Sequence, residues 1–179
     1  MPLRFFIEYL KHPKEIGSVT PSSHFLTNAM LHNVDWMNAR TVVELGPGDG
    51  VMTKSILQRL NRDTQLVVFE TNPVCAAALR EINDDRLRVQ ESSAWDIEKH
   101  VTQGSVDAVI SGIPLSNFSH EETRVLARSI KEVLRPGGIY VQFQYLPLRL
   151  ADVRAVFPQV RTTWEVRNIP PACVYKAVF

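Results

Sequence analysis

Three glycines and an acid form the most chemically informative stretch of this 179-residue chain. The stretch is TVVELGPGDGVMT, residues 41–53, in which Glu44 is followed by Gly46, Gly48 and Gly50. Glycines between a strand and the next helix let the backbone approach a ligand closely. The spacing is neither the G-x-G-x-x-G of dinucleotide sites nor a phosphate loop with Gly-Lys-Ser/Thr. It favours another nucleotide-like ligand, and the alternative is a tight turn that binds nothing.

A second acid supports the ligand interpretation. Glu70 ends the next apolar run, QLVVFE. A carboxylate at the end of a second parallel strand can accept hydrogen bonds from both hydroxyls of a ribose. Because the two features are independent, their agreement favours a nucleoside-containing ligand over a simple turn.

The elements that must position these residues follow from the hydrophobic pattern. Apolar runs alternate with segments of helical periodicity, which predicts parallel βαβ units in an α/β, Rossmann-like fold. Strands are expected at residues 41–46, 65–70, 86–90, 106–111 and 139–145. Helices are expected at residues 51–61, from Asn72-Pro73, from Ser119 with Glu122 to about Leu134, and at 150–157. Residues 159–168 and 172–179 would close a mostly parallel seven-stranded sheet as an antiparallel pair.

One domain is expected over residues 1–179, with helices on both faces of the sheet. Residues 1–40 form an N-terminal helical cap and residues 41–179 the Rossmann-like core. The cap pattern predicts two helices, within RFFIEYLKHPKEIG and PSSHFLTNAMLHNVDWM, and Ser22 or Ser23 is the start signal of the second.

Composition limits the functional classes. Net charge is +1, with 45% hydrophobic and 22% charged residues, which is typical of a globular protein. The two cysteines, Cys75 and Cys173, form neither a zinc motif nor a disulfide framework, so we expect no metal and a reducing, cytoplasmic location. No apolar run reaches the roughly 20 residues of a membrane span. The modest charge disfavours sequence-independent nucleic-acid binding.

Nearly the whole chain resembles the small bacterial phospholipid N-methyltransferases. These lie within the class I S-adenosylmethionine-dependent methyltransferases, alongside the ribosomal RNA adenine dimethylases. The matching stretches are YLKHPKEIGSVTPSS, VVELGPGDGVMT, FETNP, VDAVISGIPL, LRPGG, QFQY and RNIPPACVY. The resemblance implies transfer of a methyl group from S-adenosylmethionine to the amine of phosphatidylethanolamine at a membrane surface, with S-adenosylhomocysteine as product.

The resemblance also implies roles for individual residues. The implied cofactor-binding residues are Glu44, Gly46, Gly48, Gly50, Glu70, Ser93, Ala94 and Ser111. Glu44 would orient the cationic amino group of the cofactor and Glu70 would bind its ribose. The chain departs from the family at Ser92-Ser93-Ala94, where G-D-A is common. Ser93 can accept one hydrogen bond there, and Asp96 or Trp95 could compensate for the missing acid.

The loop after the fourth strand bears on the methyl acceptor. Enzymes that methylate nucleobase amines commonly carry an N-P-P-Y-like motif, whereas this chain has Ser111-Gly112-Ile113-Pro114-Leu115. The missing amide and aromatic groups disfavour a nucleobase. We expect Gly112, Ile113 and Pro114 to bind the substrate, together with Tyr9; the alternative is a turn that only packs on the core.

Methyl transfer to a neutral amine mainly requires alignment, so a dedicated base is optional. The candidates for a base are Tyr145 and His24, with Tyr9 a more distant third. Residues 1–15 interleave aromatic and basic side chains, as an interfacial helix does, and we expect them to bind the membrane peripherally. An amphipathic helix packed on the domain is the alternative.

The sequence is also compatible with two other functional classes. One is a methyltransferase that acts on ribosomal RNA adenine or a small soluble amine. The other is a module that binds S-adenosylmethionine without catalysis, which the departure at Ser93 motivates.

Overall fold

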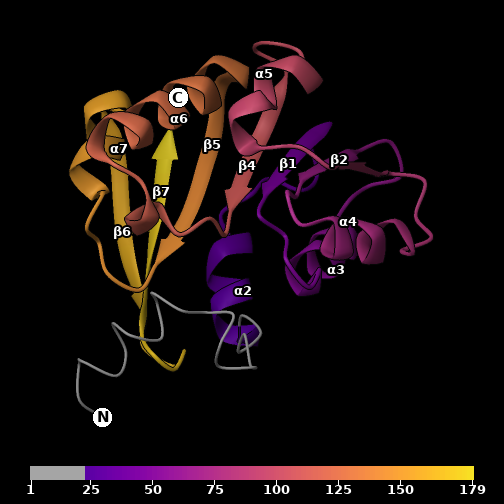
Figure 1. Ribbon diagram of the computed structural model, residues 1–179, viewed down its shortest axis with the longest axis horizontal. Coiled ribbons are helices and arrows are strands. Elements are labelled where there is room, and N and C mark those ends of the chain that lie inside the picture. The colour runs from indigo at the N-terminus through magenta and orange to yellow at the C-terminus, as the bar shows by residue number, and fades with distance from the viewer. Residues whose placement is uncertain (1–22) are drawn as a thin grey trace.

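The computed structural model describes residues 23–179, and its centre is one seven-stranded sheet (Figure 1). The strands are β1 (Thr41–Leu45), β2 (Gln65–Phe69), β3 (Leu87–Gln90), β4 (Val106–Ser111), β5 (Leu134–Gln144), β6 (Gln159–Glu165) and β7 (Ala172–Val178). Their order across the sheet is β3-β2-β1-β4-β5-β7-β6. Strands β3, β2, β1, β4 and β5 pair in parallel, while β7 is antiparallel to both β5 and β6. The expected mostly parallel seven-stranded, Rossmann-like fold is confirmed.

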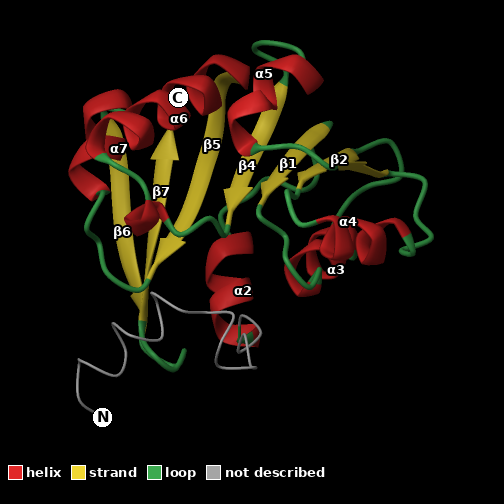
Figure 2. Ribbon diagram, in the orientation of Figure 1, coloured by secondary structure: helices red, strands yellow, loops and turns green. Residues whose placement is uncertain are grey.

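Alternation along the central strands divides the core into two layers. Val42 packs into one layer, whereas Val43 packs into the other. Helices cover both faces of the sheet, as Figure 2 shows. Buried residues of α2, α3 and α4 join the layer of Val42, and those of α5, α6 and α7 join the layer of Val43.

Three of the helices in the described part of the chain begin at capping signals that the sequence contains. The helix bounds are α2 (His24–Leu31), α3 (Val51–Leu57), α4 (Pro73–Arg80), α5 (Ile97–His100), α6 (His120–Val133) and α7 (Leu150–Val156). Short 3-10 turns are η1 (Ala94–Asp96) and η2 (Leu115–Asn117). The Asn72 side chain caps α4 with Pro73 in its first turn, and Ser119 and Glu122 form the predicted capping box of α6. Each of these signals acts within one turn, which is why the sequence predicts them well.

Several boundaries differ from the prediction: α3 ends at Leu57 rather than near residue 61, and β6 ends at Glu165 rather than at residue 168. Strand β5 begins at Leu134, directly after α6, rather than at Ile139. Leu134 pairs with Val106 and Ile139 with Ala108, so an irregularity in the register accommodates the intervening Arg-Pro-Gly-Gly. Helix α2 starts at the predicted Ser23 cap but is shorter than its periodic segment. The other predicted cap helix lies outside the described residues.

A membrane span was not expected. Over residues 23–179, every helix is too short or too polar to cross a bilayer.

Candidate functional site

A pocket of about 390 Å³ lies at the carboxyl ends of β1, β2, β3 and β4. It is lined by Gly46, Phe69, Glu70, Thr71, Ser92, Ser93, Ala94, Trp95, Gly112, Ile113, Pro114 and Phe118. Its volume falls within the range of about 300–1,000 Å³ typical of small-molecule sites. Its position is the crevice outside the strand ends where open α/β sheets bind their ligands.

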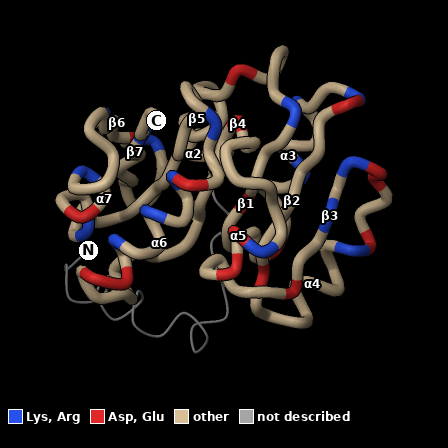
Figure 3. Tube along the Cα trace, turned by 90° about the horizontal axis from the view of Figure 1, so that it is seen from above, with Lys and Arg blue, Asp and Glu red and all other residues tan. Residues whose placement is uncertain are grey.

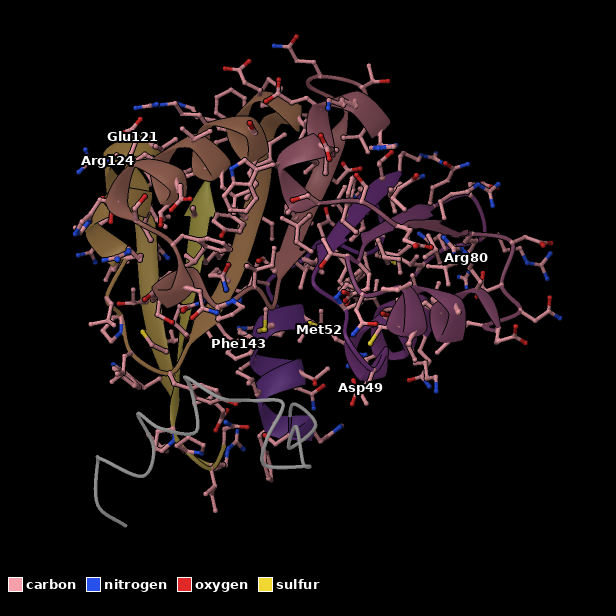
Figure 4. The ribbon with its side chains drawn as sticks, viewed as in Figure 1. Asp49, Met52, Arg80, Glu121, Arg124 and Phe143 are labelled. Carbon is pink, nitrogen blue, oxygen red and sulfur yellow. The ribbon has the colours of Figure 1, made fainter. Side chains whose placement is uncertain are left out.

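The glycine-rich loop forms one wall of the pocket and depends on left-handed backbone angles. Gly46, Gly48 and Gly50 have φ of 70°, 56° and 76°, a region that side chains with a Cβ rarely adopt. A Cβ on Gly46 would lie 3.0 Å from Cγ1 of Ile113, so the first glycine also lets the two pocket loops approach each other. Asp49 lies within the loop, between Gly48 and Gly50, and Met52 lies in the first turn of α3 (Figure 4).

Glu70 is held in place by backbone amides from both sides. Its Oε2 accepts a hydrogen bond from Gly48 N at 3.1 Å, and its Oε1 accepts one from Asn72 N at 2.8 Å. Each carboxylate oxygen has a second lone pair, so both can still accept a hydroxyl hydrogen bond. Glu70 is therefore pre-positioned at the pocket, where the sequence predicted a ribose.

Glu44 lies in a different environment, within the neighbouring strand β1 one residue before its end. It is buried behind the glycine loop and does not line the pocket, and the Thr53 hydroxyl donates to its Oε2 at 2.7 Å. Burial raises the pKa of Glu44 to about 8, because the ionised form loses its hydration and the Thr53 hydrogen bond offsets only part of that cost. A cationic group brought close to this carboxyl would favour the ionised form.

The loop after β3 presents serines rather than an acid. The Ser93 hydroxyl accepts from Trp95 N at 3.4 Å and thereby caps the η1 turn. Asp96 is bound by the Ser92 hydroxyl at 3.0 Å and by Lys99 at 2.6 Å, and it is not among the pocket residues. Trp95 does line the pocket, with its ring 4.8 Å from that of Phe118 in an edge-to-face arrangement. Of the two suggested compensations for the missing acid, Trp95 is the one at the pocket.

The loop after β4 is fixed by side chains of β5. The Ile113 carbonyl accepts from the side-chain amides of Gln142 at 3.0 Å and Gln144 at 2.9 Å, and both glutamines are buried. Tyr140 donates its hydroxyl hydrogen to Oε1 of Gln142 at 2.8 Å. The Ser111 hydroxyl accepts from Ile113 N at 3.3 Å, so the buried Ser111 supports the loop without lining the pocket. Both lone pairs of the Ile113 carbonyl are thus engaged by the protein itself.

Gly112 gives the same loop its close approach to β1. Its N–H donates to the Leu45 carbonyl at 2.9 Å, and a Cβ at this position would lie 3.2 Å from the Gly46 carbonyl oxygen. The ring of Phe143, labelled in Figure 4, lies 3.7 Å from that Cβ position. A side chain on residue 112 would therefore push the two pocket loops apart.

The two candidate bases that the structure describes lie outside the pocket lining. Tyr145 packs edge-to-face against Phe143, with ring centroids 5.7 Å apart, at the end of β5. His24 begins α2, and its Nε2 lies 2.8 Å from the Asn28 amide nitrogen. Tyr9, and the whole segment 1–15, lie outside the described residues.

The structure brings the predicted residues Gly46, Glu70, Ser93, Ala94, Gly112, Ile113 and Pro114 together around the pocket. It places Glu44, Gly48, Gly50 and Ser111 behind or beside it. Sequence reasoning missed Thr71, Phe118, Gln142 and Gln144. Thr71 could have been found by its adjacency to Glu70, but the others depend on contacts between distant segments. Within residues 23–179, no three His, Cys, Asp or Glu side chains gather into a metal-binding group.

Known proteins are similar to this chain in sequence. A family described as "Methyltransferase domain" matches residues 42–138. The ornithine lipid N-methyltransferase of Singulisphaera acidiphila is 37% identical over 177 residues, which cover 96% of this chain and 92% of that protein.

Solved structures of lower sequence identity share the fold. Spermidine synthase from Thermotoga maritima matches with a TM-score of 0.70 at 14% identity, over 88% of this chain and 60% of its own. The CurJ carbon methyltransferase matches with a TM-score of 0.63 at 17% identity, over 79% of this chain and 49% of its own. The chain thus spans less than two thirds of these structures, and at such identities the likeness concerns the fold alone.

Proposed function

The chain belongs to the methyltransferase domain family and is an S-adenosylmethionine-dependent methyltransferase, and from this premise we propose that it methylates the amine of a membrane lipid. The observation that carries the proposal is the 37% identity, over nearly the full length of both chains, to a protein named as a lipid N-methyltransferase. The pocket supports it, because Ile113, Pro114 and Phe118 give its substrate side an apolar lining.

We propose that the cofactor occupies the 390 Å³ pocket, and the residues present fit it. Glu70 would bind the ribose hydroxyls, since its two oxygens keep free lone pairs. Ser93, Ala94 and the Trp95 ring would contact the adenine. Glu44 would favour the cationic amino end from behind the glycine loop, where burial raises its pKa.

In this proposal the protein aligns the reactants and supplies little further chemistry. When bound, S-adenosylmethionine provides a methyl group that is already activated. The loop of Gly112, Ile113 and Pro114 would orient the neutral amine, and the apolar walls would exclude water. Because the Ile113 carbonyl is occupied by two glutamine amides, we assign it to shaping the loop rather than to accepting the substrate amine.

Phosphatidylethanolamine and an ornithine lipid are the two acceptors to compare. The sequence resemblance favours the first, and the name of the relative favours the second. Nucleic acid is not proposed: Figure 3 shows acidic and basic residues interspersed along the described chain rather than gathered in a basic stripe.

We further propose that residues 1–15 contact the membrane, on the interleaving of aromatic and basic residues in the sequence. Removal of these residues is expected to lower co-sedimentation with anionic vesicles. Equal co-sedimentation of the full-length and shortened chains would contradict this.

The test of the main proposal is a transfer assay with methyl-labelled S-adenosylmethionine. Vesicles contain phosphatidylethanolamine, ornithine lipid or only phosphatidylcholine, and Glu70→Ala serves as the matched variant impaired in cofactor binding. We expect label in one of the two amine lipids, none with phosphatidylcholine, and at least about a tenfold loss with Glu70→Ala, because two charge-assisted hydrogen bonds are removed. Cofactor binding without label in either lipid would refute a lipid acceptor.

A further inference from the structure

Exposed apolar side chains gather where the chain projects beyond the sheet. The loop between β6 and β7, residues 166–171, extends past the carboxyl ends of the parallel strands, next to the first turn of α2 (Figure 1). We define the edge patch as Phe25, Val166, Arg167 and Ile169. Val166 is 70% exposed, Ile169 83% and Phe25 43%. Single exposed apolar residues are ordinary, but a group on one projection indicates a binding surface.

The edge patch is held in place by hydrogen bonds. The Ser23 hydroxyl donates to Asn168 Oδ1 at 2.5 Å, and the Asn168 amide donates to the Pro170 carbonyl at 2.7 Å. Asn168 itself is buried. The start of α2 and the β6–β7 loop therefore form one anchored unit, with Val166 and Ile169 on either side of the buried anchor.

The charge of the edge patch suits a lipid headgroup layer. The Arg167 guanidinium lies 4.5 Å above the ring of Phe25. Glu165, the acid nearest to the patch in sequence, is buried and directs both oxygens at Arg167, at 2.9 and 2.8 Å. Arg167 remains largely exposed and keeps further N–H groups for phosphate oxygens. Apolar side chains flanked by an arginine match the acyl and headgroup levels of a membrane.

The location of the edge patch favours a membrane surface as its binding partner. Strands β1, β2, β3 and β4 end at the pocket. Because β7 is antiparallel to both β5 and β6, β6 runs parallel to those strands and ends at the edge patch, so the pocket and the patch lie on one edge of the sheet. A lipid that presents its amine to the pocket must approach from that edge. We propose that the edge patch docks on the membrane surface, with Val166 and Ile169 inserted at the acyl boundary and the pocket mouth at headgroup level. This inference rests on the proposed lipid substrate.

The test uses the full chain and a double variant, Val166→Ser with Ile169→Ser. The matched control is Met37→Ser, which removes an equally exposed side chain, 81% exposed, before β1 at the opposite edge. Co-sedimentation with phosphatidylethanolamine vesicles measures docking. We expect about a tenfold weaker partition for the double variant, because two apolar side chains no longer insert, and no change for the control. Turnover on vesicles should fall in parallel, while turnover on a monomeric short-chain form of the lipid should not.

A gain of binding provides a second test that does not depend on losing apolar surface. Val166→Trp is expected to strengthen the partition, because Trp favours the membrane interface. The inference is overturned if both variants partition like the wild-type chain. If neither lipid form is methylated, the proposed lipid substrate is refuted. The co-sedimentation comparison still tests the edge patch in that case, because vesicle binding requires no turnover.

Discussion

Two glutamates near the carboxyl ends of adjacent strands differ in how their charge is stabilised. Glu70 receives two backbone N–H groups, whereas Glu44 is buried with one hydroxyl partner. Glu44 lies within β1, opposite Val68, whereas Glu70 directly follows the last residue of β2, so the two carboxyl groups lie in different surroundings. Glu70 is ready to accept hydroxyl hydrogen bonds, and the raised pKa of Glu44 makes its charge depend on a nearby cation.

The raised pKa of Glu44 predicts a pH-dependent stability of the cofactor-free protein. The folded chain holds this proton up to a pKa of about 8, whereas the unfolded chain releases it near 4.5. Between these values the folded state binds more protons, so the free energy of unfolding falls as the pH rises, by on the order of a few kcal/mol. Glu44→Gln should remove most of this fall in urea titrations at pH 5 and pH 8.5.

Thr53→Val serves as the control for this comparison. It removes the hydroxyl partner of Glu44 but keeps the carboxyl group, so the fall in stability between the two pH values should persist or grow. An equal pH dependence in wild-type and Glu44→Gln chains would contradict the assignment.

At the level of elements, side chains of β5 fix the position of the loop that follows β4. Gln142 and Gln144 of β5 donate to the Ile113 carbonyl, which lies just after β4. The parallel pairing of β4 with β5 places Ser111 opposite Gln142, so both glutamines lie next to the loop. The irregular start of β5 determines which β5 residues reach this position. The geometry of the loop of residues 112–114 is therefore a property of the strand pair.

Gln144→Leu tests this arrangement. One donor to the Ile113 carbonyl is lost, and we expect stability to fall by about 1–3 kcal/mol and turnover by about tenfold, because the loop loses its alignment. Cofactor affinity should change less, since Glu70 and the glycine loop are untouched. Calorimetric binding and the transfer assay separate the two effects.

The same change at Gln103 gives the matched comparison. Gln103 is exposed and bonds Glu132 at 2.6 Å, away from the pocket. Gln103→Leu should leave turnover unchanged. Equal turnover in the two variants would show that the Gln144 contact with the loop of residues 112–114 does not matter for turnover.

Across the whole molecule, one carboxylate joins three strands at the amino edge of the sheet. Asp107 of β4 accepts from Arg40 N at 2.7 Å and Thr41 N at 2.9 Å, where β1 begins, and from Arg135 of β5 at 2.5 Å. Burial raises the pKa of Asp107, but the hydrogen bonds from Thr41, Arg135 and Arg40 outweigh it, and the net pKa is lowered. The contact holds the strands together at the edge opposite the pocket.

Asp107→Asn is expected to destabilise the protein by about 1–3 kcal/mol at pH 7, because Asn replaces a charged acceptor of three N–H groups. Since the folded-state pKa is below its usual 3.8, the contribution of Asp107 is present above that value and is lost as the pH falls. The difference between the two chains should therefore shrink at pH 3. Urea unfolding at both pH values measures it.

Asp63→Asn is the control for the loss of one negative charge, because it removes a carboxylate near Arg40 on the exposed surface. Asp63 is 82% exposed and lies 3.6 Å from Arg40, so its loss should change the unfolding free energy by less than about 1 kcal/mol. A comparable loss from the two substitutions would contradict the structural role of Asp107.

The sequence by itself determined what depends on neighbouring residues. The strand that begins at Thr41, the glycine-rich turn after it, the Asn72 cap and the capping box of Ser119 all follow from interactions within a few positions. Glu70 was placed correctly because a residue that ends a parallel strand must lie at the carboxyl edge of the sheet.

Only the tertiary structure decided the contacts between segments that are distant in sequence, because these contacts depend on which strands lie side by side. It brought Gln142 and Gln144 to Ile113, Asp107 to Thr41, and Arg167 to Phe25. It also showed that Glu44 lies behind the pocket and that Phe118 lines it. These contacts join segments tens of residues apart. Local propensity carries no information about them, because they arise from the strand order and the packing of the sheet as a whole.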